Sequence, residues 1–308
     1  MKILITGSVG MVGRNILENR DIQKYNVVNP SLSELNLLNY SDIENYLKQC
    51  KPDMVIHCAG RVGGIQANMK NMYAFFTENA LMGINLVRAA KENGVKKFLN
   101  LSSSCTYPRN AKNPLKEEYV LQGELEPTNE GYALAKLSVQ KMCEYISKEC
   151  LDFQYKTLIP CNLYGRWDKF DEKYSHMVPS VIKKIHNAKK MGVEKIEIWG
   201  DGTARREFMY AADMASAVVK AIEKFEDIPS IMNIGLGVDF TINEYYETVK
   251  NVLGYKGSFV HDVSKPSGMK QKLLDITKQT KWGWKPATSL QEGISKTYRF
   301  FLEKNGEN

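Results

Sequence analysis

The stretch Met1–Leu17, MKILITGSVGMVGRNIL, decides the fold class. It begins with a run of β-forming apolar residues, passes through a turn containing Gly7, Gly10 and Gly13, and ends in apolar residues at helical spacing. Glycines at this spacing allow a tight turn, let the backbone approach a pyrophosphate and let the following helix pack closely on a sheet. Because a strand, this turn and a helix follow one another, the stretch predicts a dinucleotide-binding site.

The same alternation continues along the chain. Strand-like runs YNVVN, PDMVIHCAG, KKFLNL and QYKTLIP are separated by helical stretches, which are YSDIENYLKQC, a long helix from about Lys70 to Asn93 and another from about Asn129 to Lys148. The runs are nearly continuously apolar, as parallel strands buried on both faces are. We therefore predict an α/β fold of the Rossmann type, a doubly wound parallel sheet with helices on both faces.

After about Tyr164 the alternation becomes less regular, and the segments carry more tryptophan and charge. We expect a smaller C-terminal substrate-binding lobe, interrupted by returns to the sheet near REFMYAADMASAVVKAI and IMNIGLG. The expected division assigns residues 1–163 and about 207–238 to a dinucleotide-binding domain, and about 164–206 and 239–308 to the lobe.

The amino-acid composition and net charge limit the classes of partner that the protein is expected to bind. The 308 residues are 43% hydrophobic, enough for a sizeable core. The net charge of +7 comes from lysines and arginines interleaved with acidic residues, which favours a multiply charged anionic ligand over nucleic acid. No apolar segment approaches the roughly 20 residues that span a bilayer, and no signal peptide precedes the first strand. Six cysteines without a CxxC pair indicate reduced thiols. We expect a cytoplasmic protein with no membrane, nucleic-acid or metal partner.

A tyrosine and a lysine in NEGYALAKLS provide the first catalytic pattern. Tyr132 and Lys136 are four residues apart, so a helix places them on one face. An ammonium beside a phenol lowers a pKa that starts near 10, which suits the tyrosine to proton transfer. The stretch LSSSCTYP, residues 101–108, places serines and a cysteine after the fourth strand. The order of glycine turn, serine and YxxxK predicts an active site.

The end of the second strand bears on the choice of cofactor. An acidic residue there would bind the ribose hydroxyls and signal NAD, but the sequence reads VVNPSLSE. This favours NADPH/NADP, because Ser31 or Arg14 could meet a 2′-phosphate, and NAD is not excluded. The predicted cofactor-binding residues are Gly7, Gly10, Gly13, Met11, Val12, Ser31 and Lys136.

Seven strings spread over essentially the whole chain resemble the GDP-L-fucose synthase family of the extended short-chain dehydrogenase/reductase superfamily. They are RVGGIQAN, SSSCTYP, LQGELEPTNEGYALAK, CNLYGRWDKF, SHMVPSVIKK, WGDGTARREF and SKPSG followed by KLLD. That family epimerises GDP-4-keto-6-deoxymannose at C3 and C5 and reduces C4 with NADPH. The resemblance implies a GDP-linked 4-keto-6-deoxy sugar as substrate, and a homodimer formed through the two long helices that flank the sheet.

The resemblance also implies roles for single residues. Ser103 would hydrogen-bond the substrate carbonyl, Tyr132 would supply the proton and Lys136 would tune it. Cys105 and His176 match the pair that removes and returns protons beside the ketone, and a thiol and an imidazole suit this near pH 7. The implied substrate-binding residues are Asn162, Lys184, Trp199 and Arg206.

Departures from the family strings keep other functions open. NLYGP reads NLYGRW, so Arg166 and Trp167 change the loop expected to frame the sugar, SKPDG reads SKPSG at Ser267, and Val9 stands where some members carry an arginine. The close alternative is a dedicated C4 reductase of a GDP-4-keto-6-deoxy-heptose without epimerase activity. More distant alternatives are an NAD-dependent nucleotide-sugar 4-epimerase and a non-catalytic dinucleotide-sensing regulator.

Overall fold

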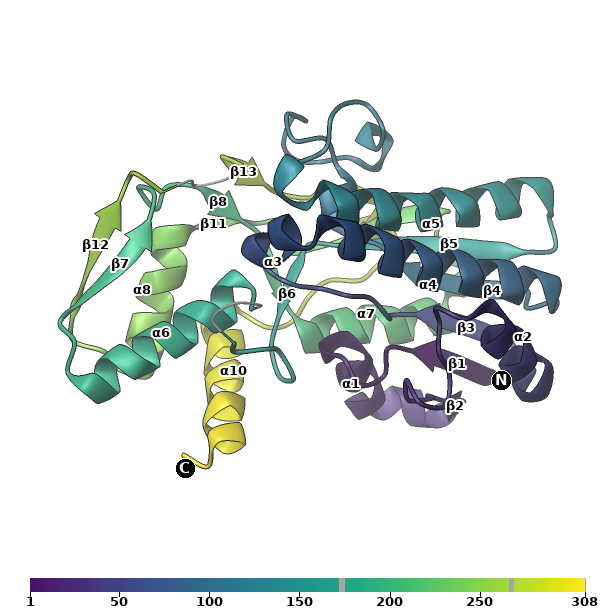
Figure 1. The fold of residues 1–308 in the computed structure, drawn as a ribbon, viewed down its shortest axis with the longest axis horizontal. Coiled ribbons are helices and arrows are strands. Elements are labelled where there is room, and N and C mark those ends of the chain that lie inside the picture. Colours follow the sequence, from purple (N-terminus) through teal and green to yellow (C-terminus); the bar gives the residue numbers. More distant parts are fainter. Residues whose placement is uncertain (172–174, 266–268, 308) are drawn as a thin grey trace.

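A six-stranded sheet with helices on both faces forms the larger part of the molecule (Figure 1). The computed structural model describes residues 1–171, 175–265 and 269–307, so Ser267 lies outside the described residues. The strand order is β10-β5-β4-β3-β1-β2, and every neighbouring pair is parallel. This confirms the predicted doubly wound α/β fold. Its strands are β1 (Lys2–Thr6), β2 (Asn26–Val28), β3 (Met54–His57), β4 (Lys97–Leu101), β5 (Gln154–Pro160) and β10 (Ile231–Ile234).

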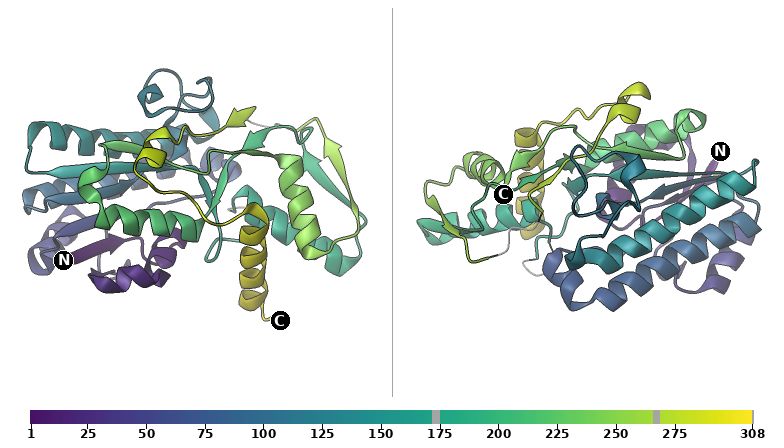
Figure 2. Two further views of the ribbon diagram at one scale, coloured as in Figure 1. Left: turned by 180° about the vertical axis from the view of Figure 1, so that it is seen from behind. Right: turned by 90° about the horizontal axis from the view of Figure 1, so that it is seen from above.

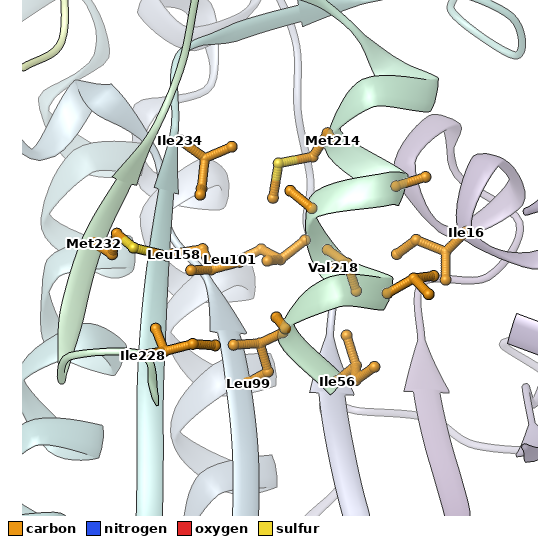
Figure 3. Close-up of a cluster of buried hydrophobic side chains, with 14 of the residues drawn as sticks. Ile16, Ile56, Leu99, Leu101, Leu158, Met214, Val218, Ile228, Met232 and Ile234 are labelled. Carbon is orange, nitrogen blue, oxygen red and sulfur yellow. The ribbon is translucent and has the colours of Figure 1, made fainter. Parts of the chain in front are cut away.

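The helices of this part divide between the two faces of the sheet. Residues of α1 and α7 belong to one buried cluster, and residues of α2, α4 and α5 to another. In the first cluster Ile16 and Val218 pack toward Ile56 and Leu99 from the strands, and all four are fully buried (Figure 3). The helices are α1 (Met11–Glu18), α2 (Tyr40–Cys50), α3 (Ile65–Lys70), α4 (Met72–Glu92), α5 (Glu130–Glu149) and α7 (Ala211–Glu223).

Two glycines fix the position of α5 against α4. A Cβ at Gly83 would lie 2.3 Å from a methyl group of Val139, and one at Gly131 would lie 2.8 Å from the carbonyl oxygen of Met72. Side chains at these positions would push the helices apart, because protein interiors leave no room for atoms at such distances. The close approach therefore sets the position of the first turns of α5.

Most of the remaining elements form a lobe beside the sheet (Figure 2), whereas α9 lies against β10 of the sheet. Here α6, α8 and α10 surround a separate hydrophobic cluster. Three small sheets accompany them, in which β6 pairs with β9, β7 with β12, and β8 with β11 and β13. The elements are β6 (Asn162–Tyr164), α6 (Met177–Met191), β7 (Lys195–Trp199), β8 (Arg205–Arg206), β9 (Phe208–Tyr210), β11 (Phe240–Thr241), α8 (Ile242–Leu253), β12 (Ser258–Asp262), β13 (Gln271–Lys272), α9 (Thr277–Lys281) and α10 (Leu290–Asn305).

The chain returns to the sheet more than once. Strand β10 pairs with β5 and α7 covers a face of the sheet, whereas β9 pairs with β6 outside it. Leu274 and Trp284 also pack into the cluster that contains α7, and the side chain of Gln279 bonds both the N–H and the carbonyl of Gly235 at 2.7 and 3.0 Å. The boundaries of the two expected domains stay a prediction. Among the described residues no helix is long and apolar enough to cross a membrane.

Candidate active site

The glycine turn between β1 and α1 is shaped by close backbone approaches. Gly7 has φ +73°, and a Cβ there would lie 2.5 Å from the backbone nitrogen of Ala59. A Cβ at Gly13 would lie 2.3 Å from the carbonyl oxygen of Gly7. At Gly10, which precedes the first turn of α1, a Cβ would meet only the Gly7 oxygen at 3.3 Å. The turn thus leaves room in front of a helix N-terminus, where unpaired N–H groups attract an anion.

The residues beyond β2 carry a negative charge that the sequence analysis did not single out. The N–H and the hydroxyl of Ser31 both donate to Oε2 of Glu34 at 2.7 Å. Arg14 is engaged elsewhere, because its Nε donates to the carbonyl of Val9 at 3.0 Å and its guanidinium lies 4.1 Å from the ring of Trp167. Two residues were expected to meet a 2′-phosphate. Ser31 lies beyond the end of β2 and bonds Glu34, and the guanidinium of Arg14 lies against Trp167 in the loop after β6.

Three predicted catalytic residues lie together at the carboxyl end of β4. Ser103 follows β4, and Tyr132 and Lys136 lie in the first turns of α5. The Ser103 hydroxyl lies beside the phenol of Tyr132, close enough to act on its pKa. Nζ of Lys136 donates to the carbonyl of Leu101 at 3.0 Å and lies 5.9 Å from the centre of the Tyr132 ring.

Burial controls the ionisation of this group. It raises the pKa of Tyr132 well above its ordinary value, and the hydrogen bond from Ser103 lowers it only in part. Burial also lowers the pKa of Lys136 to about 8, although the nearby Cys58 acts in the opposite direction. The phenol was expected to have a lowered pKa, but its pKa is raised because the phenolate would be buried. The separate effect of Lys136 on the phenol stays a prediction. Tyr132 keeps its proton near neutral pH and is suited to donate it.

Cys105 lies beside this group, in the short 3₁₀ helix Ser104–Thr106. Its Sγ accepts hydrogen bonds from Nδ2 of Asn129 at 3.2 Å and from Nζ of Lys272 at 3.5 Å. Neither donor is among the site residues predicted from the sequence. Both fall in strings that carry the family resemblance, Asn129 before the YxxxK helix and Lys272 in KLLD.

His176 lies at the start of α6, on the lobe. Its Nδ1 is 4.0 Å from Oδ1 of Asp168, a carboxylate that is 5% exposed and that the sequence analysis did not single out. Among the described residues, the hydrogen bonds of the Cys105 Sγ come from Asn129 and Lys272 and not from His176. The structure thus places the two predicted proton-transfer residues on different elements without a direct bond.

Two of the predicted substrate-binding residues meet on the outer part of the lobe. Nζ of Lys184, on α6, donates to the backbone carbonyl of Glu197 at 2.5 Å. The indole of Trp199, at the end of β7, donates to the side chain of Glu197 at 3.0 Å and is 46% exposed. An exposed aromatic ring is suited to stack on a base, and a lysine is suited to bind phosphate.

The other two lie nearer the sheet. Nδ2 of Asn162, on β6, donates to the carbonyl of Glu207 at 3.0 Å. Arg206, on β8, directly precedes Glu207, and burial lowers its pKa. A cavity of about 660 Å³ opens beside β8 and β13, and its lining includes Arg109 and Arg205.

The departures at Arg166 and Trp167 make their contacts away from Cys105. The indole of Trp167 donates to Glu18 on α1 at 2.7 Å, and its ring lies 4.9 Å from that of Phe300 on α10. Arg166 is 3.6 Å from the same Glu18 carboxylate. These contacts tie the loop to α1 and α10, which weakens the argument from this loop for a different sugar.

Comparison with known proteins gives close relatives over the whole chain. Residues 3–235 match the NAD dependent epimerase/dehydratase family. The chain is 54% identical to a GDP-L-colitose synthase of Yersinia pseudotuberculosis, with all of both chains covered. It is 48% identical to a GDP-L-fucose synthase of Azorhizobium caulinodans, with 99% of this chain and 97% of that protein covered.

Solved structures of GDP-sugar reductases have the same fold as this chain. A GDP-6-OMe-4-keto-L-xylo-heptose reductase from C. jejuni superposes with a TM-score of 0.91 at 31% identity, covering 99% of this chain and 98% of that chain. A GDP-mannoheptose C4 reductase from Campylobacter jejuni with NADP bound superposes with a TM-score of 0.87 at 32% identity, covering 97% and 98%. With the glycine turn and the Ser103–Tyr132–Lys136 group in place, the chain belongs to the NAD dependent epimerase/dehydratase family, in its GDP-L-fucose synthase branch, and is an NAD(P)-dependent oxidoreductase.

Proposed function

We propose that the protein epimerises the carbons that flank the ketone of a GDP-4-keto-6-deoxy sugar and then reduces C4 with NADPH. The proposal rests on the group of residues at the end of β4. Tyr132, which keeps its proton, lies there beside Ser103 and Cys105, and the Sγ of Cys105 accepts two hydrogen bonds. The names of relatives at 54% and 48% identity support the class of substrate.

The residues of the chain fit the reduction step. The space in front of α1 accommodates a pyrophosphate, because a Cβ at Gly10 would meet only one atom closely. The bound cofactor supplies a hydride from C4 of its nicotinamide. Tyr132 donates its proton to the carbonyl oxygen, and Ser103 hydrogen-bonds the same oxygen as negative charge develops there. The ammonium of Lys136 lies near the Tyr132 ring, and its positive charge stabilises the negative charge that develops there when Tyr132 gives up its proton.

The epimerisation step needs a base on one face of a carbon and an acid on the other. The ketone acidifies the C–H bonds on both neighbouring carbons, so a thiolate or an imidazole can remove these protons near neutral pH. Cys105 and His176 are the two groups of the required chemistry. Asp168 lies near the second, with its Oδ1 4.0 Å from Nδ1 of His176, on the side of the ring away from Nε2.

The substrate anion would bind along the lobe. Lys184 and Arg206 supply positive charge for a diphosphate, Asn162 lines the sugar pocket and Trp199 offers an exposed ring. This arrangement would also explain the excess of basic residues in the sequence.

The test is to incubate the protein with GDP-4-keto-6-deoxymannose and NADPH in deuterated water and to examine the product by NMR. Deuterium at carbons flanking C4, together with oxidation of NADPH and inverted stereochemistry, is the expected result. Reduction without deuterium would contradict the epimerase part and favour the dedicated C4 reductase of a GDP-4-keto-6-deoxy-heptose. The structural likeness to two heptose C4 reductases is the reason to include a heptose substrate.

The more distant alternatives make different demands. A nucleotide-sugar 4-epimerase would hold NAD tightly through purification, which mass spectrometry of the denatured protein would detect. A non-catalytic regulator would not need the proton of Tyr132, yet the residue and its serine partner are both present.

We propose that the protein is a homodimer assembled through α4 and α5 and acts in the cytoplasm. Apolar side chains exposed on these helices support the dimer, among them Tyr73 at 82%, Leu81 at 48% and Leu134 at 40%. Its six unpaired cysteines support a reducing compartment. Light scattering of the purified protein should give twice the mass of the chain, and Leu81→Glu should reduce it to that of one chain.

A further inference from the structure

Lys272 reaches the active site from a distant part of the chain. It lies on β13, 167 residues after Cys105 in the sequence, and its Nζ donates to Sγ of Cys105 at 3.5 Å. The side chain is half-buried, and among the described residues no carboxylate lies within ion-pairing distance of it. Its ammonium is thus directed to a thiol rather than to an acidic partner.

The position of Lys272 is fixed by backbone pairing on one side and by a bond to a side chain on the other. Gln271 and Lys272 pair in parallel with Arg205 and Arg206 of β8. On the other side, the N–H of Leu273 donates to the side chain of Asn113 at 2.8 Å. A long side chain that starts from so fixed a backbone position loses less freedom when it binds its partner.

A cation at this distance favours the thiolate over the thiol. The amide of Asn129 adds a second donor to Sγ at 3.2 Å, and a thiolate accepts both bonds better than a neutral thiol. The charged and titratable neighbours of Sγ are Lys272 from β13 and Tyr132 from α5. Because Tyr132 keeps its proton, Lys272 supplies the charge that acts on the sulfur.

We propose that Lys272 is a positioning residue that holds Cys105 as the thiolate required for proton removal beside the ketone. This rests on the proposed function, in which Cys105 is one of the two proton-transfer groups. The thiolate takes the proton and becomes a thiol, the electron pair of the C–H bond passes into the enolate, and Lys272 keeps its own protons. The return of a proton to the other face of the carbon completes the inversion.

The first test measures the thiolate directly and needs no substrate. The native protein is treated with iodoacetamide near pH 7, and peptide mass spectrometry follows alkylation of Cys105 with Cys150 as the internal reference. Lys272→Met should slow alkylation of Cys105 relative to Cys150 by about tenfold, because only the thiolate reacts. Lys272→Arg should restore much of the rate, and Lys112→Met, an exposed lysine on the neighbouring loop, should leave it unchanged.

The second test separates positioning from substrate binding. In deuterated water with the keto sugar, Lys272→Met should lower kcat for deuterium uptake beside the ketone by about tenfold and leave KM unchanged. A raised KM with unchanged kcat would show that Lys272 binds the substrate and would overturn the proposal. An unchanged alkylation ratio in both Lys272→Met and Lys272→Arg would overturn it as well.

The two tests also distinguish this inference from the proposed function. If the unmodified protein takes up no deuterium, the epimerase part of that function fails. The alkylation ratio then still decides whether Lys272 controls the ionisation of Cys105.

Discussion

At the scale of single residues, we expect reduction to depend most on Tyr132. Its raised pKa keeps the phenol protonated near neutral pH, so the proton is available when the C4 oxygen gains charge. Tyr132→Phe keeps the ring and the packing of α5 and removes only that proton. We expect it to lower the rate of NADPH oxidation with the keto sugar by about 10²–10⁴-fold, the usual contribution of general acid catalysis. NADPH binding, followed by fluorescence, should change little, and an unimpaired rate would contradict the assigned role.

We expect Lys136 to give the reduction step its pH dependence. Burial lowers its pKa to about 8, so the ammonium loses its proton as the pH rises through this value. We expect the rate of C4 reduction to fall above about pH 8, where the positive charge beside Tyr132 disappears. A pH profile of single-turnover reduction measures this, with Lys136→Arg as the comparison because arginine stays charged. A profile that stays level beyond pH 9 would rule out this role.

At the scale of elements, the loop between β6 and α6 joins the two parts of the molecule. Trp167 has φ +70°, a conformation that non-glycine residues rarely adopt, and its contacts with Glu18 and Arg14 hold it there. The next residue is Asp168, the carboxylate that lies near His176. The contacts with α1 therefore help to set where the predicted acid–base histidine stands.

Removing this anchor should affect the epimerisation step before the reduction step. Trp167→Ala deletes the hydrogen bond to Glu18 and the stacking with Arg14, and we expect a loss of about 1–3 kcal/mol in the free energy of unfolding. In deuterated water the ratio of deuterium uptake to NADPH oxidation should fall. Urea unfolding and NMR of the product provide the two measurements, and Glu18→Gln, which keeps an acceptor for the indole, is the milder control. An unchanged ratio would separate this loop from His176.

For the whole molecule, Glu207 connects segments that are far apart in the sequence. It is 1% exposed, and its carboxylate accepts N–H bonds from Leu236 at 2.6 Å, Gly237 at 2.9 Å and Leu274 at 2.9 Å. Burial nevertheless raises its pKa to about 7. The buried carboxylate of Glu207 thus holds the loop after β10 to the segment before α9.

The raised pKa of Glu207 makes the free energy of unfolding depend on pH. The unfolded chain releases the proton of Glu207 near pH 4.5 and the folded chain near pH 7, so the folded state binds more protons between these values. The contribution of Glu207 to the free energy of unfolding should therefore fall as the pH rises from about 4.5 through 7, by on the order of 3 kcal/mol. Urea unfolding at pH 5 and pH 8 measures the slope. Glu207→Gln does not titrate and should flatten it, and equal slopes would contradict the assignment.

The sequence by itself determined the order of elements and predicted which residues form the site. Apolar periodicity and the glycine turn are local features, so they gave the doubly wound fold and the ends of α4 and α5 within two residues. The serine and YxxxK patterns likewise follow from spacing along one strand end and one helix.

Only the tertiary structure decided which distant groups act on that chemistry. It brought Lys272 to Cys105, turned Arg14 toward Trp167 instead of the end of β2, and raised rather than lowered the pKa of Tyr132. Contacts between segments more than a hundred residues apart depend on how the lobe packs against the sheet, which no local pattern encodes. Burial is likewise a collective property of all the surrounding atoms, so the spacing of Tyr132 and Lys136 could not reveal which effect on the phenol is larger.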